Sequence, residues 1–217
     1  MLRFLLPFLL AGTAVAGQSA DSTAVRRLDV GLSYAYWQHE VDFTPSAEVE
    51  ALPGTTYGLA LRYFDNRVVG FQAELNYVNA GWRETLDTNF TSLYERRTEY
   101  LELLLLTQLR IGRGVVQPIL QAGPYFSVPL AEEESIPAEY VPGDGVLPEY
   151  YGFAFPFRLN YGLQAALGVN VALGPLTLQL EGRYLTGFND VVKTGTTTAV
   201  ISRRRGFGGR VGVLYRF

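Results

Sequence analysis

The feature that most constrains this 217-residue chain is a hydrophobic period of two, which recurs along almost its whole length. From Leu159 to Leu173 every odd-numbered residue is apolar, whereas the even-numbered positions hold Asn, Gly, Gln and Ala. Successive side chains of a β-strand point to opposite faces, so this alternation predicts a strand with one apolar face. After Gly174 and Pro175 the apolar positions become even-numbered, which is the change that a two-residue hairpin turn requires.

The same alternation predicts about eight strands of roughly ten residues or more, long enough to cross a bilayer when tilted. They start near residues 28, 57, 71, 101, 116, 159, 176 and 207. The fifth contains Pro118 and Pro124, which lack the backbone N–H of a sheet ladder, so we expect a bulge or a local break there. The fourth is irregular, because Leu104 and Leu106 lie on its polar face and Thr107 on its apolar face.

The composition of the polar face indicates which face lies inside. Only 18% of the residues are charged, against about 25% in soluble domains, and Lys193 is the only lysine. The polar positions hold mostly Gly, Gln, Asn and Thr, which suit a narrow interior better than a surface in water. We therefore predict an all-β fold, an eight-stranded antiparallel transmembrane up-and-down β-barrel with its apolar face toward lipid. Charged residues expected to pair in its lumen are Arg62, Glu74, Glu102, Arg110, Glu181, Arg183, Arg210 and Arg216.

Residues 1–16 are typical of a secretory signal peptide. Arg3 supplies the positive start, an apolar run follows, and Ala14-Val15-Ala16 forms the cleavage site. A buried N-terminal helix is the alternative, which Pro7 and Gly12 disfavour. The prediction leaves 17–27 as a periplasmic segment and 28–217 as the barrel. The chain has no cysteine, which excludes disulfides, thiolate metal sites and a thiol nucleophile.

Connection lengths predict the orientation. The links 65–69, 112–114 and 174–175 are short, whereas those at about 38–55, 82–97, 129–156 and 186–205 are long. Outer-membrane barrels have short periplasmic turns and long outer loops, so we expect both termini in the periplasm. Aromatic residues fall at both expected membrane boundaries, as interface girdles do. They are Tyr36, Tyr57, Tyr63, Phe71, Tyr77, Phe126, Tyr184, Phe188, Phe207, Tyr215 and Phe217.

Several stretches resemble the outer-membrane β-barrel family that includes the PorT-like proteins of Bacteroidota. The resemblance rests on residues 70–77, 100–104, 121–125 and 212–217, within a layout that covers about 28–217. It implies an eight-stranded barrel inserted by the outer-membrane assembly machinery. That machinery recognises an alternating last strand with a final aromatic residue, which makes Tyr215 and Phe217 the expected assembly signal. The resemblance implies no activity.

Two charged runs are candidate contacts of the outer loops. Glu132, Glu133 and Glu134 begin an acidic loop that could take calcium or a cationic partner, although no calcium-loop spacing is present. The three arginines Arg203–Arg205 could bind lipopolysaccharide phosphates, or could pair with that acidic loop.

Catalysis has one candidate, the lone histidine His39, which has Glu40, Asp42 and Ser46 nearby. A rim triad for lipid A modification is conceivable, but a loop histidine is more often solvated, and no nucleophile motif is present. We therefore expect no catalytic residue, no metal and no cofactor.

The function expected from these patterns is non-enzymatic. The net charge of −3 gives no reason to expect nucleic acid. An eight-stranded barrel is just wide enough for its own side chains, which disfavours a diffusion porin. We expect a binding, adhesion or envelope-organising barrel that acts through outer loops or as a subunit of a complex, with lipopolysaccharide and other envelope proteins as partners. A narrow channel, a rim enzyme and a soluble lipocalin-like carrier are the alternatives.

Overall fold

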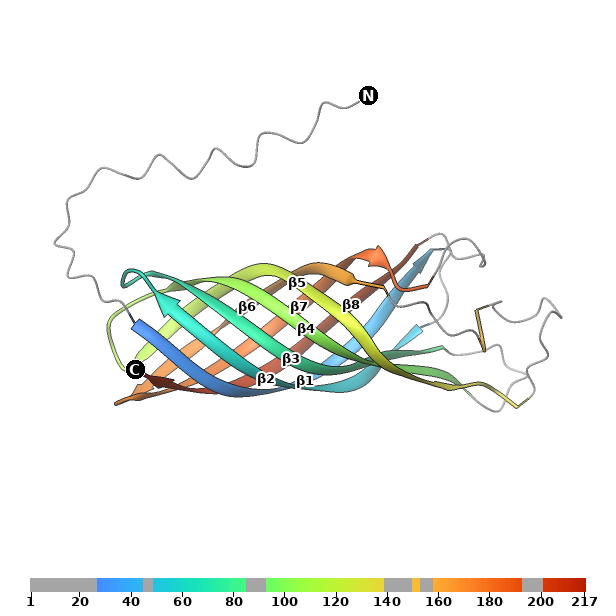
Figure 1. The fold of residues 1–217 in the computed structure, drawn as a ribbon, viewed down its shortest axis with the longest axis horizontal. Helices are drawn as coiled ribbons and strands as arrows, with labels where there is room; N and C mark the ends of the chain where they lie inside the picture. The colour runs from blue at the N-terminus through green and yellow to red at the C-terminus, as the bar shows by residue number, and fades with distance from the viewer. Residues whose placement is uncertain (1–26, 45–48, 85–92, 139–149, 153–157, 193–200) are drawn as a thin grey trace, which may run out of the picture.

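The computed structural model describes residues 27–44, 49–84, 93–138, 150–152, 158–192 and 201–217. In these ranges the chain forms one closed barrel in which each strand pairs antiparallel with the next and the last strand pairs with the first (Figure 1). The strands are β1 (Arg27–Thr44), β2 (Val49–Phe64), β3 (Val69–Glu84), β4 (Tyr94–Arg110), β5 (Val116–Ser135), β6 (Asn160–Leu173), β7 (Leu176–Asp190) and β8 (Ile201–Arg216). The predicted fold class is confirmed.

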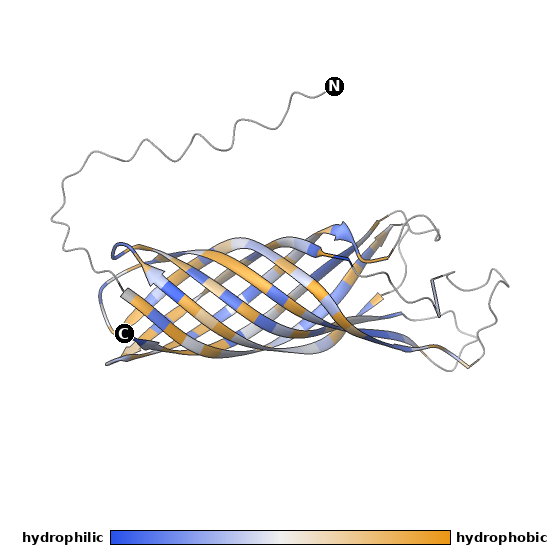
Figure 2. Cartoon of the chain, in the orientation of Figure 1, coloured by the Kyte–Doolittle hydropathy of each residue, from blue (hydrophilic) through white to orange (hydrophobic). Residues whose placement is uncertain are grey.

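The barrel carries its apolar side chains on the outside. Leu32, Leu59 and Leu167 are all more than half exposed, whereas Gln108, Gln121 and others of the polar parity are completely buried. Figure 2 shows alternating hydrophobic and hydrophilic residues along the strands in the middle of the barrel. Water would disfavour such a surface, and lipid would cover it.

The strands run further than the sequence predicted. β1 continues to Thr44 and β2 begins at Val49, so most of the predicted 38–55 loop is strand, and the other three long loops are shortened in the same way. The reason is an inversion of polarity. Along β1 the outward residues become Gln38, Glu40 and Asp42, while Val41 and Phe43 turn inward. A prediction that follows the apolar residues on one face of a strand stops where the apolar residues move to the other face. The strand itself continues beyond that point.

We call the strand ends beyond this inversion the outer extension. It comprises residues 38–44, 49–55, 79–84, 94–99, 131–135 and 201–205, and it lies at the long-loop end of the barrel in Figure 1. Its outward side is polar, so it stands beyond the apolar belt that would contact hydrocarbon. The start of β1 and the C-terminal Phe217 lie at the opposite end.

The prolines of β5 cause no bulge, and the predicted local break is limited to the pairing with β4. Pro118 and Pro124 pair with Val169 and Leu163 of β6 in an unbroken register. On the β4 side the pairing is interrupted opposite Pro124 but resumes without a shift. The β4–β5 register shifts instead at Glu99, in the outer extension.

No helix within the described ranges is long and apolar enough to cross a membrane. The predicted signal peptide and nearly all of the 17–27 segment lie outside the described residues.

Candidate functional site: a filled lumen and a closed outer mouth

The short-turn end of the lumen holds a buried ion pair that the sequence did not predict. Arg62 donates from Nε and Nη2 to Asp29 Oδ2, at 2.9 and 2.6 Å, and from Nη1 to Asn170 Oδ1. Arg216 lies 3.8 Å from Asp29 and is partly exposed at this rim. Arg110, which was predicted to pair in the lumen, donates to the backbone carbonyl of Arg67.

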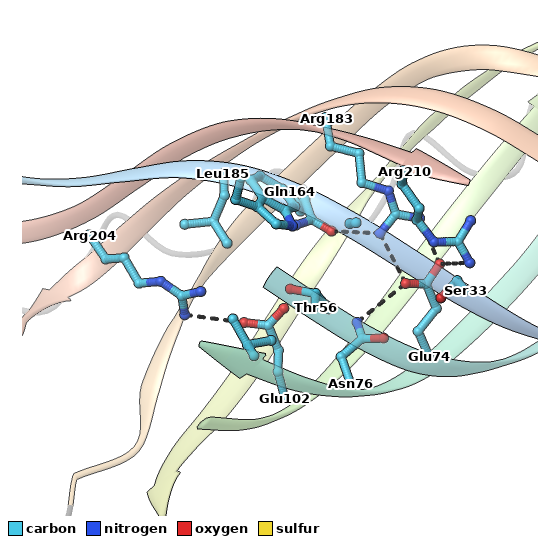
Figure 3. Close-up of a pocket in the computed structure, with 13 residues that line it drawn as sticks. Ser33, Thr56, Glu74, Asn76, Glu102, Gln164, Arg183, Leu185, Arg204 and Arg210 are labelled. Carbon is cyan, nitrogen blue, oxygen red and sulfur yellow. Dashed lines mark hydrogen bonds and ion pairs between the residues drawn. The ribbon is translucent and has the colours of Figure 1, made fainter. Parts of the chain in front are cut away.

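The middle of the lumen holds four charged side chains that we call the central cluster, Glu74, Glu181, Arg183 and Arg210. Figure 3 shows three of them, Glu74, Arg183 and Arg210. Arg183 Nη2 lies 2.7 Å from both carboxylates. Arg210 lies 3.0 Å from Glu181 and 3.2 Å from Glu74. All four side chains are at most 2% exposed, and two acids balance two arginines. Such pairing keeps buried charge tolerable, because each ion that leaves water gains partners inside.

A second buried pair lies toward the outer extension. Arg204 Nη1 donates to Glu102 Oε2 at 3.2 Å, and Ser127 donates to the same oxygen at 3.0 Å. The Arg204 guanidinium also lies over the rings of Tyr100 and Tyr125. The prediction that Arg204 makes outer-loop contacts is therefore wrong, because even-numbered residues of β8 face the lumen.

Apolar side chains also lie inside the barrel, and some of them line the same cavity as both charge groups. Leu104, Leu106 and Leu185 pack with Trp37 and Tyr125 inside the barrel, which explains the two leucines that interrupted the polar parity of β4. The cavity lined by both groups of charged residues has a volume of only about 10 Å³, enough for about one water molecule. The described lumen is therefore filled with side chains rather than open.

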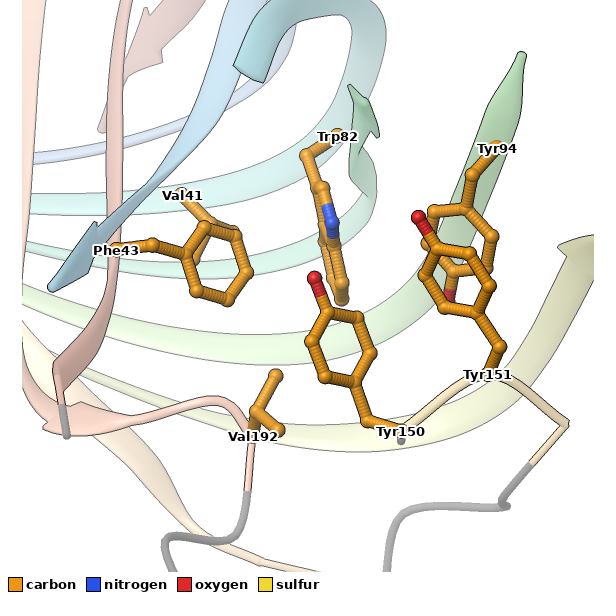
Figure 4. Packing of buried hydrophobic residues seen from close by; sticks show 7 residues of the cluster. All are labelled: Val41, Phe43, Trp82, Tyr94, Tyr150, Tyr151 and Val192. Carbon is orange, nitrogen blue, oxygen red and sulfur yellow. The ribbon is translucent and has the colours of Figure 1, made fainter. Parts of the chain in front are cut away.

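Aromatic residues close the mouth within the outer extension. This aromatic cap consists of Val41, Phe43, Trp82, Tyr94, Tyr150, Tyr151 and Val192 (Figure 4). Tyr150 and Tyr151 come from the segment between β5 and β6 and point into the mouth. The Tyr151 ring stacks on Tyr94 with centroids 3.8 Å apart, and Tyr150 stacks on Phe43 at 5.9 Å.

A buried carboxylate anchors the cap. Glu84 is 2% exposed and accepts hydrogen bonds from the hydroxyls of Tyr150 and Tyr151 and from Trp82 Nε1. Burial raises the pKa of both tyrosines, and the negative charge of Glu84 adds to the shift, so they stay protonated as donors. These bonds hold the 150–152 segment in the mouth.

The acidic run occupies a strand rather than the start of a loop. Glu132 and Glu134 lie in β5 and form ion pairs with buried Arg96 at 2.8 and 3.4 Å. Glu133 pairs in register with Arg97 on the outward side. The run is thus neutralised in part by β4, which weakens the case for a calcium loop. Within the described residues no three His, Asp or Glu side chains converge in a way that could hold a metal ion.

The other two arginines of the basic run face outward from β8. Arg205 forms an ion pair with Asp42 at 2.7 Å, and both side chains are about two-fifths exposed. Arg203 is exposed and lies between Asp42 and Asp190 in the strand register.

His39 is not a solvated loop residue. It lies in β1, is 1% exposed and stacks on Trp37, and neither ring nitrogen has a hydrogen-bond partner among the described residues. Burial lowers its pKa well below the usual value, and the charge of Arg204 lowers it further. Glu40 and Asp42 project to the other side of the strand, and Ser46 lies outside the described residues. The conceivable rim triad is therefore not assembled from the described candidates.

Sequence reasoning missed Asp29, Glu84 and Arg96. Asp29 had a usable signal, because it has the polar parity of β1 opposite Arg62. Glu84 and Arg96 had none, because both lie in ranges predicted to be loops.

Comparison with known proteins is consistent with this geometry. The family described as outer membrane protein beta-barrel domain matches residues 17–193. The crystal structure of OprG from Pseudomonas aeruginosa aligns with 89% of this chain and 97% of its own, at 14% identity and a TM-score of 0.56. The solid-state NMR structure of AlkL in DMPC bilayers aligns with 93% and 94%, also at 14% identity, with a TM-score of 0.50. These similarities show a shared fold alone. The sequence matches no curated relative.

Proposed function

The chain belongs to the outer membrane protein beta-barrel domain family, and we propose that it is a non-enzymatic barrel that binds envelope or surface partners through its outer extension. The observation that carries this proposal is the filled lumen. Two buried charge groups, an apolar cluster and the aromatic cap lie inside the barrel. A barrel with a filled lumen does not act as a wide channel, so its outward surfaces are the parts that can bind partners.

The outer extension supports this role because strands hold its charges in place. On β3 and β4, Glu95 accepts from Arg83 at 2.7 Å and from Arg97 at 2.7 Å, and Arg97 also donates to the carbonyl of Pro53. These side chains are about one-quarter to one-third exposed. A preformed polar surface of this kind costs less entropy on binding than a flexible loop does.

The proposed orientation places the short turns and both termini in the periplasm and the outer extension outside the cell. It is supported by the location of the polar extension, which sits only at the long-loop end. A closer kinship with PorT-like barrels, and recognition of Tyr215 and Phe217 by the assembly machinery, are also part of the proposal. The alternating β8 that ends in Phe217 supports the second of these.

The test compares surface and lumen variants in mild-detergent purification from outer membranes. The surface variant is Arg83→Ser/Arg97→Ser, and the matched lumen control is Glu102→Gln. A partner that accompanies the wild type and the lumen control but is lost from the surface variant supports the proposal. A partner retained equally by all three would place binding elsewhere.

The rival channel function is tested in planar bilayers. We expect no steady current from the wild-type protein, because the cavity in the lumen holds about one water molecule. A stable conductance that changes in Glu102→Gln would overturn the proposal in favour of a narrow channel. A rim enzyme is tested separately by lipid A profiles, which we expect to be identical in cells with wild-type protein and with His39→Ala.

A further inference from the structure

Two neighbouring short turns combine exposed arginines with exposed apolar residues. We call residues 65–68 and 111–115 the basic turn pair. Arg67 and Arg113 are exposed at the two tips. Neither forms an ion pair with a residue of the described chain. Val68, Ile111 and Val115 beside them are between 54% and 64% exposed.

The two turns lie side by side and are well fixed. Arg110 donates its backbone N–H to the carbonyl of Val68 at 2.7 Å, and its side chain donates to the carbonyl of Arg67 at 2.9 and 3.1 Å. The Arg110 guanidinium lies 4.1 Å from the centre of the Phe64 ring. Asn66 accepts from the backbone N–H groups that follow it, which closes the first turn.

The charge of this surface is positive. Within the basic turn pair two arginines, Arg67 and Arg113, outweigh one acid, Asp65, so the pair carries a formal charge of +1. Buried Arg110, which contacts the first turn, adds a further positive charge beside it. The outward arginines of the outer extension differ, because Arg205 is already paired with an acid.

We propose that the basic turn pair binds the headgroup phosphate of anionic phospholipid. Arginine offers several N–H donors that match phosphate oxygens. Its long side chain lets the guanidinium reach the headgroup at a distance from the backbone of the turn. The apolar neighbours decide between a lipid and a polyanion in water. Val68, Ile111 and Val115 gain nothing from an aqueous polymer, whereas the acyl boundary of a leaflet covers them.

The binding chemistry follows from the turns themselves, and only the leaflet rests on the orientation proposed above. With short turns in the periplasm, the lipid belongs to the inner, phospholipid leaflet of the outer membrane.

The test measures binding of fluorescent phosphatidylglycerol to the full-length protein in mild detergent. We expect Arg67→Gln/Arg113→Gln to weaken binding by about 30-fold, since each basic residue near an anionic headgroup contributes a factor of about five. The matched control Arg203→Gln/Arg205→Gln removes the same charge at the other end and should bind as the wild type does. Arg67→Lys/Arg113→Lys should recover most of the affinity. Heat-modifiable migration checks that every variant is folded.

Three results would overturn the proposal. The first is an equal loss of phosphatidylglycerol binding in both double arginine variants, and the second is binding of phosphatidylcholine with the same affinity. The third is complete displacement of phosphatidylglycerol by millimolar inorganic phosphate, which would indicate a free-anion site.

Orientation is tested independently with Gly114→Cys, since a Cβ at this turn position meets nothing closer than 3.8 Å. The chain has no other cysteine. Labelling of intact cells by a membrane-impermeant maleimide would refute the periplasmic placement and leave the phosphate site standing. The placement is supported if intact cells are not labelled and labelling appears once the outer membrane is permeabilised.

Discussion

Neutralising Glu74 tests whether the central cluster holds the barrel together. Its carboxylate accepts from Arg183 Nη1 and Nη2 at 2.9 and 2.7 Å, accepts from Asn76 at 3.3 Å, and lies 3.2 Å from Arg210. Glu74→Gln keeps the shape but changes the cluster from neutral to a net charge of +1. Glu181 is then the one acid left for two buried arginines.

The expected cost is about 3–5 kcal/mol in the free energy of unfolding, the range for breaking one side of a buried ion pair. The single variant Arg210→Gln should cost about as much, because it leaves an excess of negative charge. The double variant Glu74→Gln/Arg210→Gln is neutral again. We expect it to cost at least about 2 kcal/mol less than the sum of the two single variants.

The assay is reversible urea unfolding in lipid vesicles, followed by tryptophan fluorescence and by heat-modifiable migration. A Glu74→Gln cost below about 1 kcal/mol would refute the electrostatic reasoning. Additive single-variant costs, within about 0.5 kcal/mol, would show that the four charges act independently.

Three further predictions concern the outer mouth and the last strand. The folded-state pKa of His39 is lowered, so its contribution to stability is complete above about pH 6.5. This contribution is lost as the pH falls, by up to about 1.4 kcal/mol per pH unit. If urea unfolding of His39→Phe had the same pH dependence as that of the wild type, this prediction would be wrong. Tyr150→Phe and Tyr151→Phe each remove a hydrogen bond to buried Glu84, and each should lower the free energy of unfolding by about 1–3 kcal/mol. Proteolysis of the 150–152 segment should become faster. Protease resistance equal to that of the wild type would show that these hydrogen bonds do not hold the cap. Deletion of Phe217 should reduce the heat-modifiable fraction of the protein in cells, while Phe217→Trp should preserve this fraction. Normal assembly of the deletion variant would show that Phe217 is not part of the assembly signal.

Much of the barrel could be read from local sequence, because in the membrane belt most strand positions obey one rule, with exceptions such as Leu104 and Leu106 of β4. The odd-numbered residues from Leu159 to Leu173 meet lipid and their neighbours fill the lumen, so one period reports both the strand and its orientation. Glu74, Glu102 and Arg183 were expected in the interior on the same basis, and the structure buries all three.

The rule failed where the solvent changed. Above the belt water replaces lipid on the outside, so Glu40 faces outward and Phe43 inward, and the strand looks like a loop to a search for lipid-facing residues. The same change misplaced Arg204, whose buried side chain reaches Glu102 although it belongs to a run of three arginines.

The sequence by itself determined the alternation, the number of strands and the polarity of the lumen, since these depend on neighbours two residues apart and on the surrounding solvent. The tertiary structure alone decided the pairing of charges and the closure of the mouth. Arg62 meets Asp29, and Tyr150 meets Glu84 across 66 residues of chain. Such contacts depend on strand register, tilt and the path of a connecting segment, and those quantities exist only after the barrel has closed.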